Sequence, residues 1–267
     1  MEAFNALVGI LELVGFDHDI LVKYLPKFGS GLIITAEIVV FSMIVGALIA
    51  YPVAMARMSN NRVLRGFAYG YIYFFRGTPL LAQLFLIYAG LGTLLPLMRG
   101  FFENIGVWWI AREGFYYVLF AFALNTGAYQ AEILRGGVEA VPKGQQEGGQ
   151  SLGLHDGQIF RKIILPQAFV IGLRPLGNEL ILMIKASSVA SFATVFDFMG
   201  EIKRAYSQTY DFQIYIMAAI VYLILVEIIR RLWDMMEWRM TEHLRPAKGV
   251  KSLAPPPSPE PIPVDAH

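Results

Sequence analysis

Residues 31–56 have the sequence GLIITAEIVVFSMIVGALIAYPVAMA, in which Glu37 is the only charged residue. A helix of about 20 mostly apolar residues can cross the hydrocarbon core of a bilayer. Further apolar stretches follow, and together they predict spanning helices over 31–58, 64–92, 115–136, 163–200 and 211–233. The stretches are too long for barrel strands and do not alternate with period two. The sequence therefore predicts an all-α membrane protein with five transmembrane helices.

The composition supports an integral membrane protein and excludes several other classes. Of the 267 residues, 56% are hydrophobic and 16% are charged, where soluble domains have about 25% charged residues. The formal net charge of +1 offers no general attraction for nucleic acid. The chain contains no cysteine, which excludes disulfides, a thiol nucleophile and thiolate metal sites.

The basic residues predict the orientation of the chain. With the C-terminus inside, 14 of the 22 lysines and arginines fall in cytoplasmic segments and six in outer segments. Because positive charge accumulates on the cytoplasmic side of membrane proteins, we expect the N-terminus outside and the C-terminus inside. The predicted organisation is an outer interfacial helix over 1–26, a transmembrane domain over 27–245 and a disordered Pro-rich tail over 246–267.

No catalytic or metal-binding constellation is evident in the sequence. All four histidines (His18, His155, His243 and His267) fall in predicted loops or tails, and no HExxH pair is present. A phosphate-binding loop of the GxxxxGK[ST] type is also absent. We therefore expect this chain to have no catalytic site and to bind no cofactor or metal.

The loop over 137–166, between the third and fourth predicted spans, contains the most distinctive motif. Its central part reads VPKGQQEGGQSLGLHDGQIFRKIILP, from Val141 to Pro166. Pro142 is placed to begin a short helix, and Gly153 is placed to end it before a second, basic and apolar helix. The residue pattern alone leaves two interpretations open: an ordered connector, or a helix–turn–helix that meets a cytoplasmic partner.

The same loop resembles a family signature. Glu147, Gly153, Ile163, Leu165 and Pro166 match the pattern E-A-A-x3-G-x9-I-x-L-P of permease subunits of bacterial ABC importers. Two glycines replace the two alanines of the pattern, which makes the short helix intrinsically less stable by roughly 1 kcal/mol for each glycine. The stretches RGTPLL (76–81), AEILRGG (131–137) and Asn-Glu (178–179) resemble the polar amino acid branch of these permeases. The resemblance covers about residues 25–246.

The resemblance implies a type I permease fold in the bacterial inner membrane. Such a subunit pairs with a second permease and two ATP-binding cassette subunits, which bind ATP and Mg, and receives substrate from an extracytoplasmic binding protein. The short loop helix would be the coupling helix that docks in a cleft on the ATPase. The matching residues here are Gly144, Glu147, Gly148, Gly149, Gly153 and Leu154.

Charged residues inside the predicted spans are candidates for substrate contact. A break near 175–177, at Pro175 and Gly177, would free backbone groups next to Glu179. The Glu179 carboxylate can accept from an ammonium group, and Asn178, Ser187 and Ser188 can form hydrogen bonds. The alternative is that Glu179 pairs with Lys185 or Arg76 and joins two spans.

Arg76 has the same two interpretations, as a ligand for a substrate carboxylate or as part of a buried ion pair at a helix kink. We favour the ion pair. The stretches TEHLRP (241–246) and NELILM (178–183) are similar to permeases for histidine, lysine, arginine and related opines. The expected function is translocation of a polar, basic amino acid or opine by alternating access. The alternatives are a non-basic substrate and a channel or carrier that works without ATP.

Overall fold

The computed structural model describes residue 9 and residues 17–241 of the chain. All regular elements in this part are helices, as the sequence predicts, and no strand occurs among the described residues. The predicted tail over 246–267 and most of the predicted interfacial helix over 1–26 lie outside the described residues, so both stay predictions.

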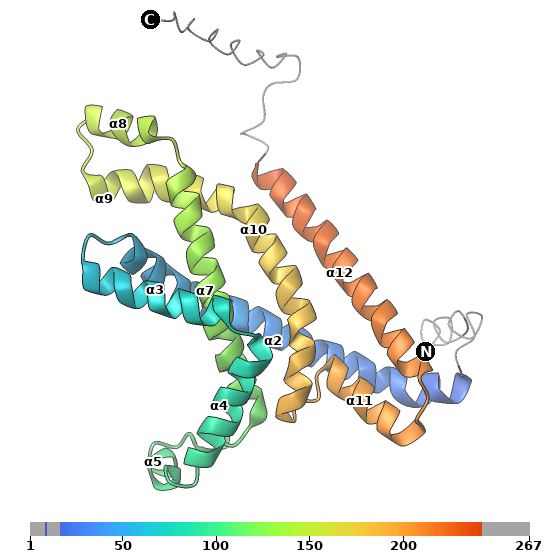
Figure 1. Ribbon diagram of the computed structural model, residues 1–267. Coiled ribbons are helices and arrows are strands. Elements are labelled where there is room, and N and C mark those ends of the chain that lie inside the picture. Colours follow the sequence, from blue (N-terminus) through green and yellow to red (C-terminus); the bar gives the residue numbers. More distant parts are fainter. Residues whose placement is uncertain (1–8, 10–16, 242–267) are drawn as a thin grey trace, which may run out of the picture.

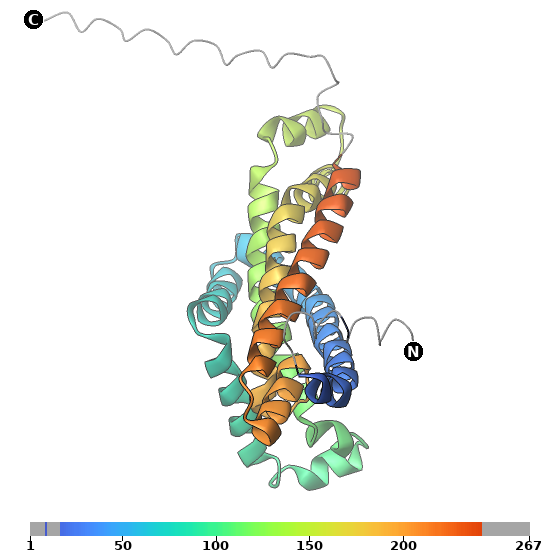
Figure 2. The ribbon, with the colours of Figure 1, turned by 90° about the vertical axis from the view of Figure 1, so that its right-hand side faces the viewer.

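The helices form an elongated bundle. In chain order they are α2 (His18–Met58), α3 (Arg62–Gly77), α4 (Leu80–Leu94), α5 (Arg99–Asn104), α6 (Trp108–Ala111), α7 (Gly114–Ala140), α8 (Lys143–Ser151), α9 (Asp156–Ile159), the π-helix η1 (Phe160–Ile164), α10 (Leu165–Ala186), the 3-10 helix η2 (Ser187–Ala193), α11 (Phe198–Thr209) and α12 (Gln213–Met240). Figure 1 shows α8 and α9 at one end of the bundle and α5 at the opposite end, and Figure 2 shows its long axis from the side.

Three stretches of the described chain are long and apolar enough to cross a membrane: Val22–Met58, Asp156–Ala193 and Gln213–Met240. The bent pair α3–α4 would make a fourth span. The helix over the third predicted span, α7, is not among these stretches, and it carries Asn125, Gln130 and Glu132 among its apolar residues. Helices thus cover all five predicted spans, and the count of five stays a prediction.

The predicted span 64–92 is wrong as a single helix. It is divided into α3 and α4, which meet at an angle of 105°. Pro79 lies at the N-cap of α4, and Thr78 before it has an extended backbone (φ −117°, ψ 148°). A proline disfavours the helical conformation of the residue that precedes it, so the helix ends there and a new one begins.

The predicted break near 175–177 is also wrong, because α10 continues through both Pro175 and Gly177. A Cβ atom on Gly177 would lie 2.3 Å from the indole Nε1 of Trp233, so glycine permits close packing between α10 and α12. The helix instead ends at Ala186, and α11 begins at Phe198. The 3-10 helix η2 continues α10 to Ala193, so the predicted span 163–200 ends about seven residues earlier than expected.

The predicted boundary at residue 26 is not a helix boundary. Residues 18–26 are the first part of α2, and Pro26 lies inside that helix. Tyr24 and Phe28 of α2 are buried against α11 and α12. Apolar packing on both sides of Pro26 thus stabilises α2 as one continuous helix.

The central helix of the bundle is α7, which packs against α2, α3, α4 and α10. Small residues allow the close contacts: a Cβ atom on Gly46 of α2 would lie 2.5 Å from the Thr126 side chain. A Cβ atom on Gly137 would likewise lie 2.5 Å from the Ala168 carbonyl oxygen of α10. Close approach of backbones through small residues is the usual way in which helices associate in membranes.

Candidate functional site

The helix–turn–helix predicted in the loop 137–166 is present. Figure 1 shows α8 and α9 extending beyond the ends of α7 and α10. Pro142 is the N-cap of α8, with an extended backbone that starts the helix at Lys143. The motif therefore presents a compact surface at one end of the molecule.

The turn after α8 requires a glycine. The Leu154 N–H donates to the Gly149 carbonyl (3.1 Å), and the Gly153 N–H donates to the Gln150 carbonyl (2.9 Å). This pair of bonds is the Schellman motif, in which the residue after the helix adopts a left-handed conformation. Gly153 has φ +74°, as the motif needs. The signature glycine is therefore explained by backbone geometry.

Gly148 and Gly149, which replace the two alanines of the signature, have different surroundings. Nothing lies within 4 Å of a Cβ atom placed on Gly148, and Gly144 is equally open. A Cβ atom on Gly149 would lie 2.9 Å from the Ile159 side chain and 3.3 Å from that of Ile163. Gly149 thus lets α8 pack closely on α9 and η1.

The outward surface of α8 is polar and exposed. Glu147 is exposed, its backbone carbonyl accepts from the Ser151 hydroxyl (2.9 Å), and no ion pair of its carboxylate occurs in the described part of the chain. Leu152 at the end of α8 is 80% exposed, whereas Leu154 is half-buried. An exposed leucine and an unpaired carboxylate on one short helix suit a surface that a partner covers.

The second helix of the motif, α9, is capped at its start and is followed by a wider, π-helical turn. The His155 backbone N–H donates to the Gln158 side chain (3.3 Å), and the His155 ring accepts from the Gly157 N–H (3.4 Å). A π-helical turn over Phe160–Ile164 follows. Pro166 lacks the N–H that an α-helix would use there, which favours the wider turn. The I-x-L-P part of the signature therefore marks the joint between the motif and α10.

Arg76 belongs to an ion-pair cluster, but its side chain is 43% exposed and not buried as in the interpretation that we favoured. Its guanidinium lies 3.9 Å from the Glu132 carboxylate, which also lies 3.9 Å from Arg57 and 2.8 Å from Arg135. The Arg76 guanidinium also lies over the Tyr129 ring, 5.1 Å from its centroid. Glu132 of α7 thus joins the ends of α2 and α3 to the central helix.

The structure does not bring the candidate substrate residues together. Glu179 of α10 is buried, while Asn178 next to it is exposed. The Ser187 hydroxyl donates to the Ile184 carbonyl (2.7 Å) and the Ser188 hydroxyl donates to the Lys185 carbonyl (2.9 Å). Glu179 forms no ion pair with Lys185 or Arg76 in the described structure.

Sequence reasoning missed a buried amide pair that holds the bend between α3 and α4. The Gln83 side-chain amide donates to the carbonyls of Phe75 (2.9 Å) and Thr78 (3.0 Å). The Asn125 amide of α7 donates to the Phe75 carbonyl (3.0 Å) and to the Gln83 amide oxygen (2.9 Å). The available signal in the sequence was the presence of two amide side chains, Gln83 and Asn125, within apolar stretches. A buried polar group needs a hydrogen-bond partner, so the two amides could have been expected to meet.

Among the described residues, no group of three or more His, Cys, Asp or Glu side chains is arranged to hold a metal ion. The exposed motif of α8 and α9 and the Glu132 ion-pair cluster are two polar features of the molecule, and α12 carries further ion pairs, of Glu237 with Arg174 and of Glu227 with Arg230 and Arg231. The motif of α8 and α9 is exposed, and the Glu132 cluster joins α2, α3 and α7.

Comparison with known proteins identifies the relatives of the chain. The family of binding-protein-dependent transport system inner membrane components matches residues 30–242. The nopaline transport system permease protein of Agrobacterium fabrum is 36% identical over 87% of this chain and 95% of its own length. The histidine/lysine/arginine/ornithine transport system permease protein of Escherichia coli K12 is 33% identical over 82% of this chain and 90% of its own length.

A solved structure agrees with these relatives. A crystal structure of an amino acid ABC transporter with histidines contains a chain that is 35% identical. The match covers 84% of this chain and 99% of that chain, with a TM-score of 0.72.

Proposed function

Since the chain belongs to the family of binding-protein-dependent transport system inner membrane components, we propose that it carries a polar, basic amino acid or an opine across the membrane as the permease subunit of an ABC importer. Its relatives are non-catalytic permease subunits of amino acid and opine importers. The observation that carries the proposal is the exposed helix–turn–helix of α8 and α9, which has the signature residues and extends beyond the bundle.

The proposed topology has five spans, with the N-terminus outside and the C-terminus inside the bacterial inner membrane. The pair α3–α4 counts as one bent span, and α7 is the third span. This arrangement puts α8 and α9 in the cytoplasm and α5, α6 and α11 on the outer side. The distribution of lysine and arginine supports it, as does the position of α5 and α8 at opposite ends of the molecule.

An importer permease works with ATPase and substrate-binding partners. We propose two ATP-binding cassette subunits, a second permease and an extracytoplasmic binding protein. The ATPase subunits hold ATP and Mg, and this chain binds no cofactor. Closure of the ATPases would move α8, and its close packing through Gly149 on α9 and η1 would carry the motion into α10.

The proposed coupling role predicts the effect of changes in α8. Gly153→Asp forces a side chain into a left-handed conformation that glycine prefers, and Glu147→Arg reverses the charge of the docking surface. We expect either variant to insert normally but to lose substrate-stimulated ATP hydrolysis in the reconstituted complex. Glu113→Arg is the control, because it reverses an exposed carboxylate near α6 and α7, far from α8.

Two outcomes would contradict this assignment. Normal substrate-stimulated ATP hydrolysis with Gly153→Asp would show that the motif is only a connector. Transport by vesicles that contain this permease without any ATPase would favour an ATP-independent channel or carrier.

We further propose that Glu179 interacts with the ammonium group of the substrate in a conformation in which α10 has moved relative to α7. Asn178, Ser187 and Ser188 supply hydrogen-bonding groups on the same helix, and Arg76 stays in its ion-pair cluster. Burial of the Glu179 carboxylate in the apolar bundle supports this idea, because an ionisable residue within a membrane span usually has a function.

The substrate proposal is tested by transport into reconstituted vesicles. Glu179→Gln keeps the size of the side chain and removes its charge, and we expect it to lower uptake of arginine or lysine. Equal uptake of glutamate and arginine by the unaltered complex would refute the basic preference and favour a non-basic polar substrate.

A further inference from the structure

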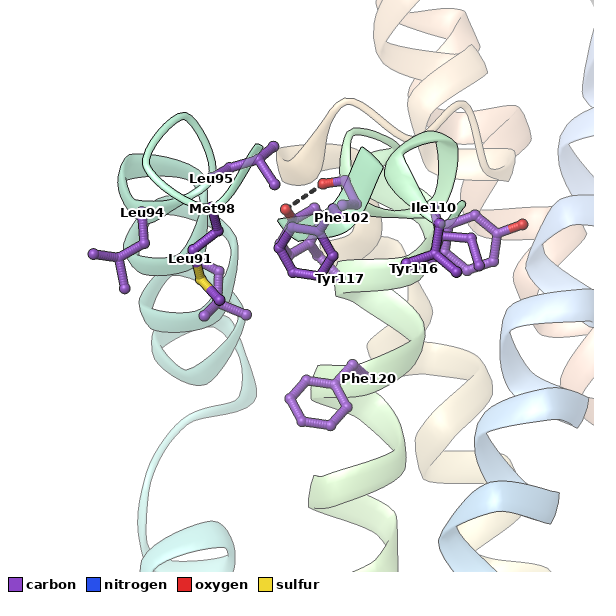
Figure 3. Close-up of a pocket in the computed structure, with 11 residues that line it drawn as sticks. Leu91, Leu94, Leu95, Met98, Phe102, Ile110, Tyr116, Tyr117 and Phe120 are labelled. Carbon is purple, nitrogen blue, oxygen red and sulfur yellow. Dashed lines mark hydrogen bonds between the residues drawn. The ribbon is translucent and has the colours of Figure 1, made fainter. Parts of the chain in front are cut away.

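An apolar cavity of about 300 Å³ lies between α4, α5, α6 and α7, at the opposite end of the bundle from α8. Figure 3 shows Leu91, Leu94 and Met98 on one side of it and Phe102, Tyr117 and Phe120 on the other. An apolar cavity of about 150 Å³ is already large enough to bind benzene. The space can therefore hold a sizeable apolar group.

The walls of the cavity are almost entirely apolar. Every lining side chain is aliphatic or aromatic or a methionine. The Tyr117 hydroxyl donates to the Ala111 carbonyl, so its hydrogen bond is already formed. Tyr116 packs edge to face against Trp109, with ring centroids 5.6 Å apart. A charged amino acid would lose its hydration in this cavity without compensation, so the cavity is unsuited to the transported substrate.

The residues around the cavity are of the kinds found where a membrane protein meets lipid headgroups. It is bounded by the end of the uncharged helix α4 and the beginning of α7, and α6 between them begins with Trp108 and Trp109. Tryptophan accumulates at the membrane–water interface. Leu91, Leu94 and Phe120 are each 41–51% exposed, so this side of the cavity is open.

The residue that follows the lining residue Ala111 is an arginine whose side chain has no partner in the described structure. This residue, Arg112, is exposed, and neither an ion pair nor a hydrogen bond of its side chain occurs among the described residues. Arg99 differs, because it pairs with Glu103 (2.8 Å). The segment 99–113, which contains α5 and α6, carries two arginines and two glutamates and so has no net charge. Its attraction for an anion therefore comes from the unpaired Arg112 alone.

We propose that this cavity binds one acyl chain of a membrane phospholipid, with the phosphate of the lipid at Arg112. The chain matches the apolar walls and the phosphate matches the unpaired guanidinium. The proposal rests on the proposed topology, which puts this end of the bundle at the membrane surface, and it is independent of the transported substrate and of the ATPase.

Photocrosslinking of the full-length chain tests the proposal. The vesicles consist of phosphatidylethanolamine and phosphatidylglycerol, with a trace of phosphatidylethanolamine that carries a diazirine on its acyl chain. A diacylglycerol with the same diazirine chain is the probe without phosphate. Mass spectrometry locates the adducts, and Leu223 of α12, which is 70% exposed, serves as the reference for ordinary lipid contact.

We expect the phospholipid adducts to concentrate on Leu91, Phe102 and Phe120. Val107→Trp fills the cavity from one wall and should lower these adducts to the level at Leu223. Leu97→Trp is the matched control, since Leu97 is 83% exposed and does not line the cavity. Its adducts should be unchanged, which separates loss of the cavity from a general effect of tryptophan.

Arg112→Gln should reduce the phospholipid adducts about fivefold, because one arginine near a lipid headgroup contributes about 1 kcal/mol. It should leave the diacylglycerol adducts unchanged. Arg62→Gln changes another exposed arginine, at the start of α3, and should have neither effect.

Three results would overturn the proposal. They are equal adduct yields at the cavity and at Leu223, equal effects of Val107→Trp and Leu97→Trp, and an Arg112→Gln effect that is absent or the same for both probes. Displacement of the adducts by an added extracytoplasmic binding protein would show that a protein, and not a lipid, covers the cavity.

Discussion

Gly148 and Gly149 are adjacent in α8, but the effect of adding a methyl group differs between them. Gly148→Ala places the methyl group in open space and should stabilise the protein by about 0.5–1 kcal/mol through helix propensity. Gly149→Ala places it against Ile159 and should destabilise the protein by about 1–3 kcal/mol through overpacking. Thermal unfolding of the two purified variants in detergent measures the difference, and equal shifts would contradict the packing argument.

Arg76 and Glu132 contribute unequally to their ion-pair cluster. The Arg76 side chain is 43% exposed and lies 3.9 Å from the carboxylate, so Arg76→Gln should cost less than about 1 kcal/mol. Glu132→Gln removes the only acidic partner of Arg57 and Arg76 in the described structure, and should cost roughly 2 kcal/mol or more.

Transport kinetics provide the second test of this cluster. If Arg76 is structural, Arg76→Gln should leave the KM for the transported amino acid unchanged. A large increase in KM without a loss of stability would show that Arg76 binds the substrate carboxylate instead.

At the scale of elements, the bend between α3 and α4 depends on one side chain of α4. Gln83→Leu keeps the approximate volume but leaves the partly buried Thr78 carbonyl without its Gln83 donor. An unsatisfied buried carbonyl costs about 1–3 kcal/mol, and water is scarce in the apolar bundle. We expect a loss of this size in the free energy of unfolding.

Gln146→Leu is the control for this change, because Gln146 is an exposed residue of α8. It should leave stability within about 0.5 kcal/mol of the unaltered protein. If the two leucine variants unfold at the same temperature, the bend is held by Pro79 alone and the amide pair contributes little.

The elements also show where local sequence signals succeed and fail. Pro79 ends α3 because a proline directly restricts the residue before it. Pro175 is a similar signal, yet α10 continues through it while Trp233 of α12 packs on the turn around Gly177 and donates to the Leu173 carbonyl (3.0 Å). The difference lies in the neighbouring helix, which the local sequence does not contain.

At the scale of the whole molecule, the proposed topology can be tested directly because the chain has no cysteine. A single cysteine at Gln146 in α8 should react with a membrane-impermeant maleimide in inverted vesicles but not in intact cells. A single cysteine at Asn104 in α5 should show the opposite pattern. Labelling of both positions from the same side would contradict the proposed orientation.

The sequence by itself determined that the protein is an all-helical membrane protein and where its exposed helix–turn–helix lies. Apolar length is a local property, and the turn at Gly153 is encoded by a single glycine within its own loop. These features need no knowledge of distant residues, so they could be predicted from the order of residues alone.

Only the tertiary structure decided how the buried polar groups are partnered. Glu132 joins arginines of α2, α3 and α7, Gln83 meets Asn125 across two helices, and Glu179 is buried apart from Asn178. A buried polar group is stable only beside a partner, and these partners lie up to 75 residues away in the chain. Their pairing depends on how the helices pack, because packing sets which side chains can meet.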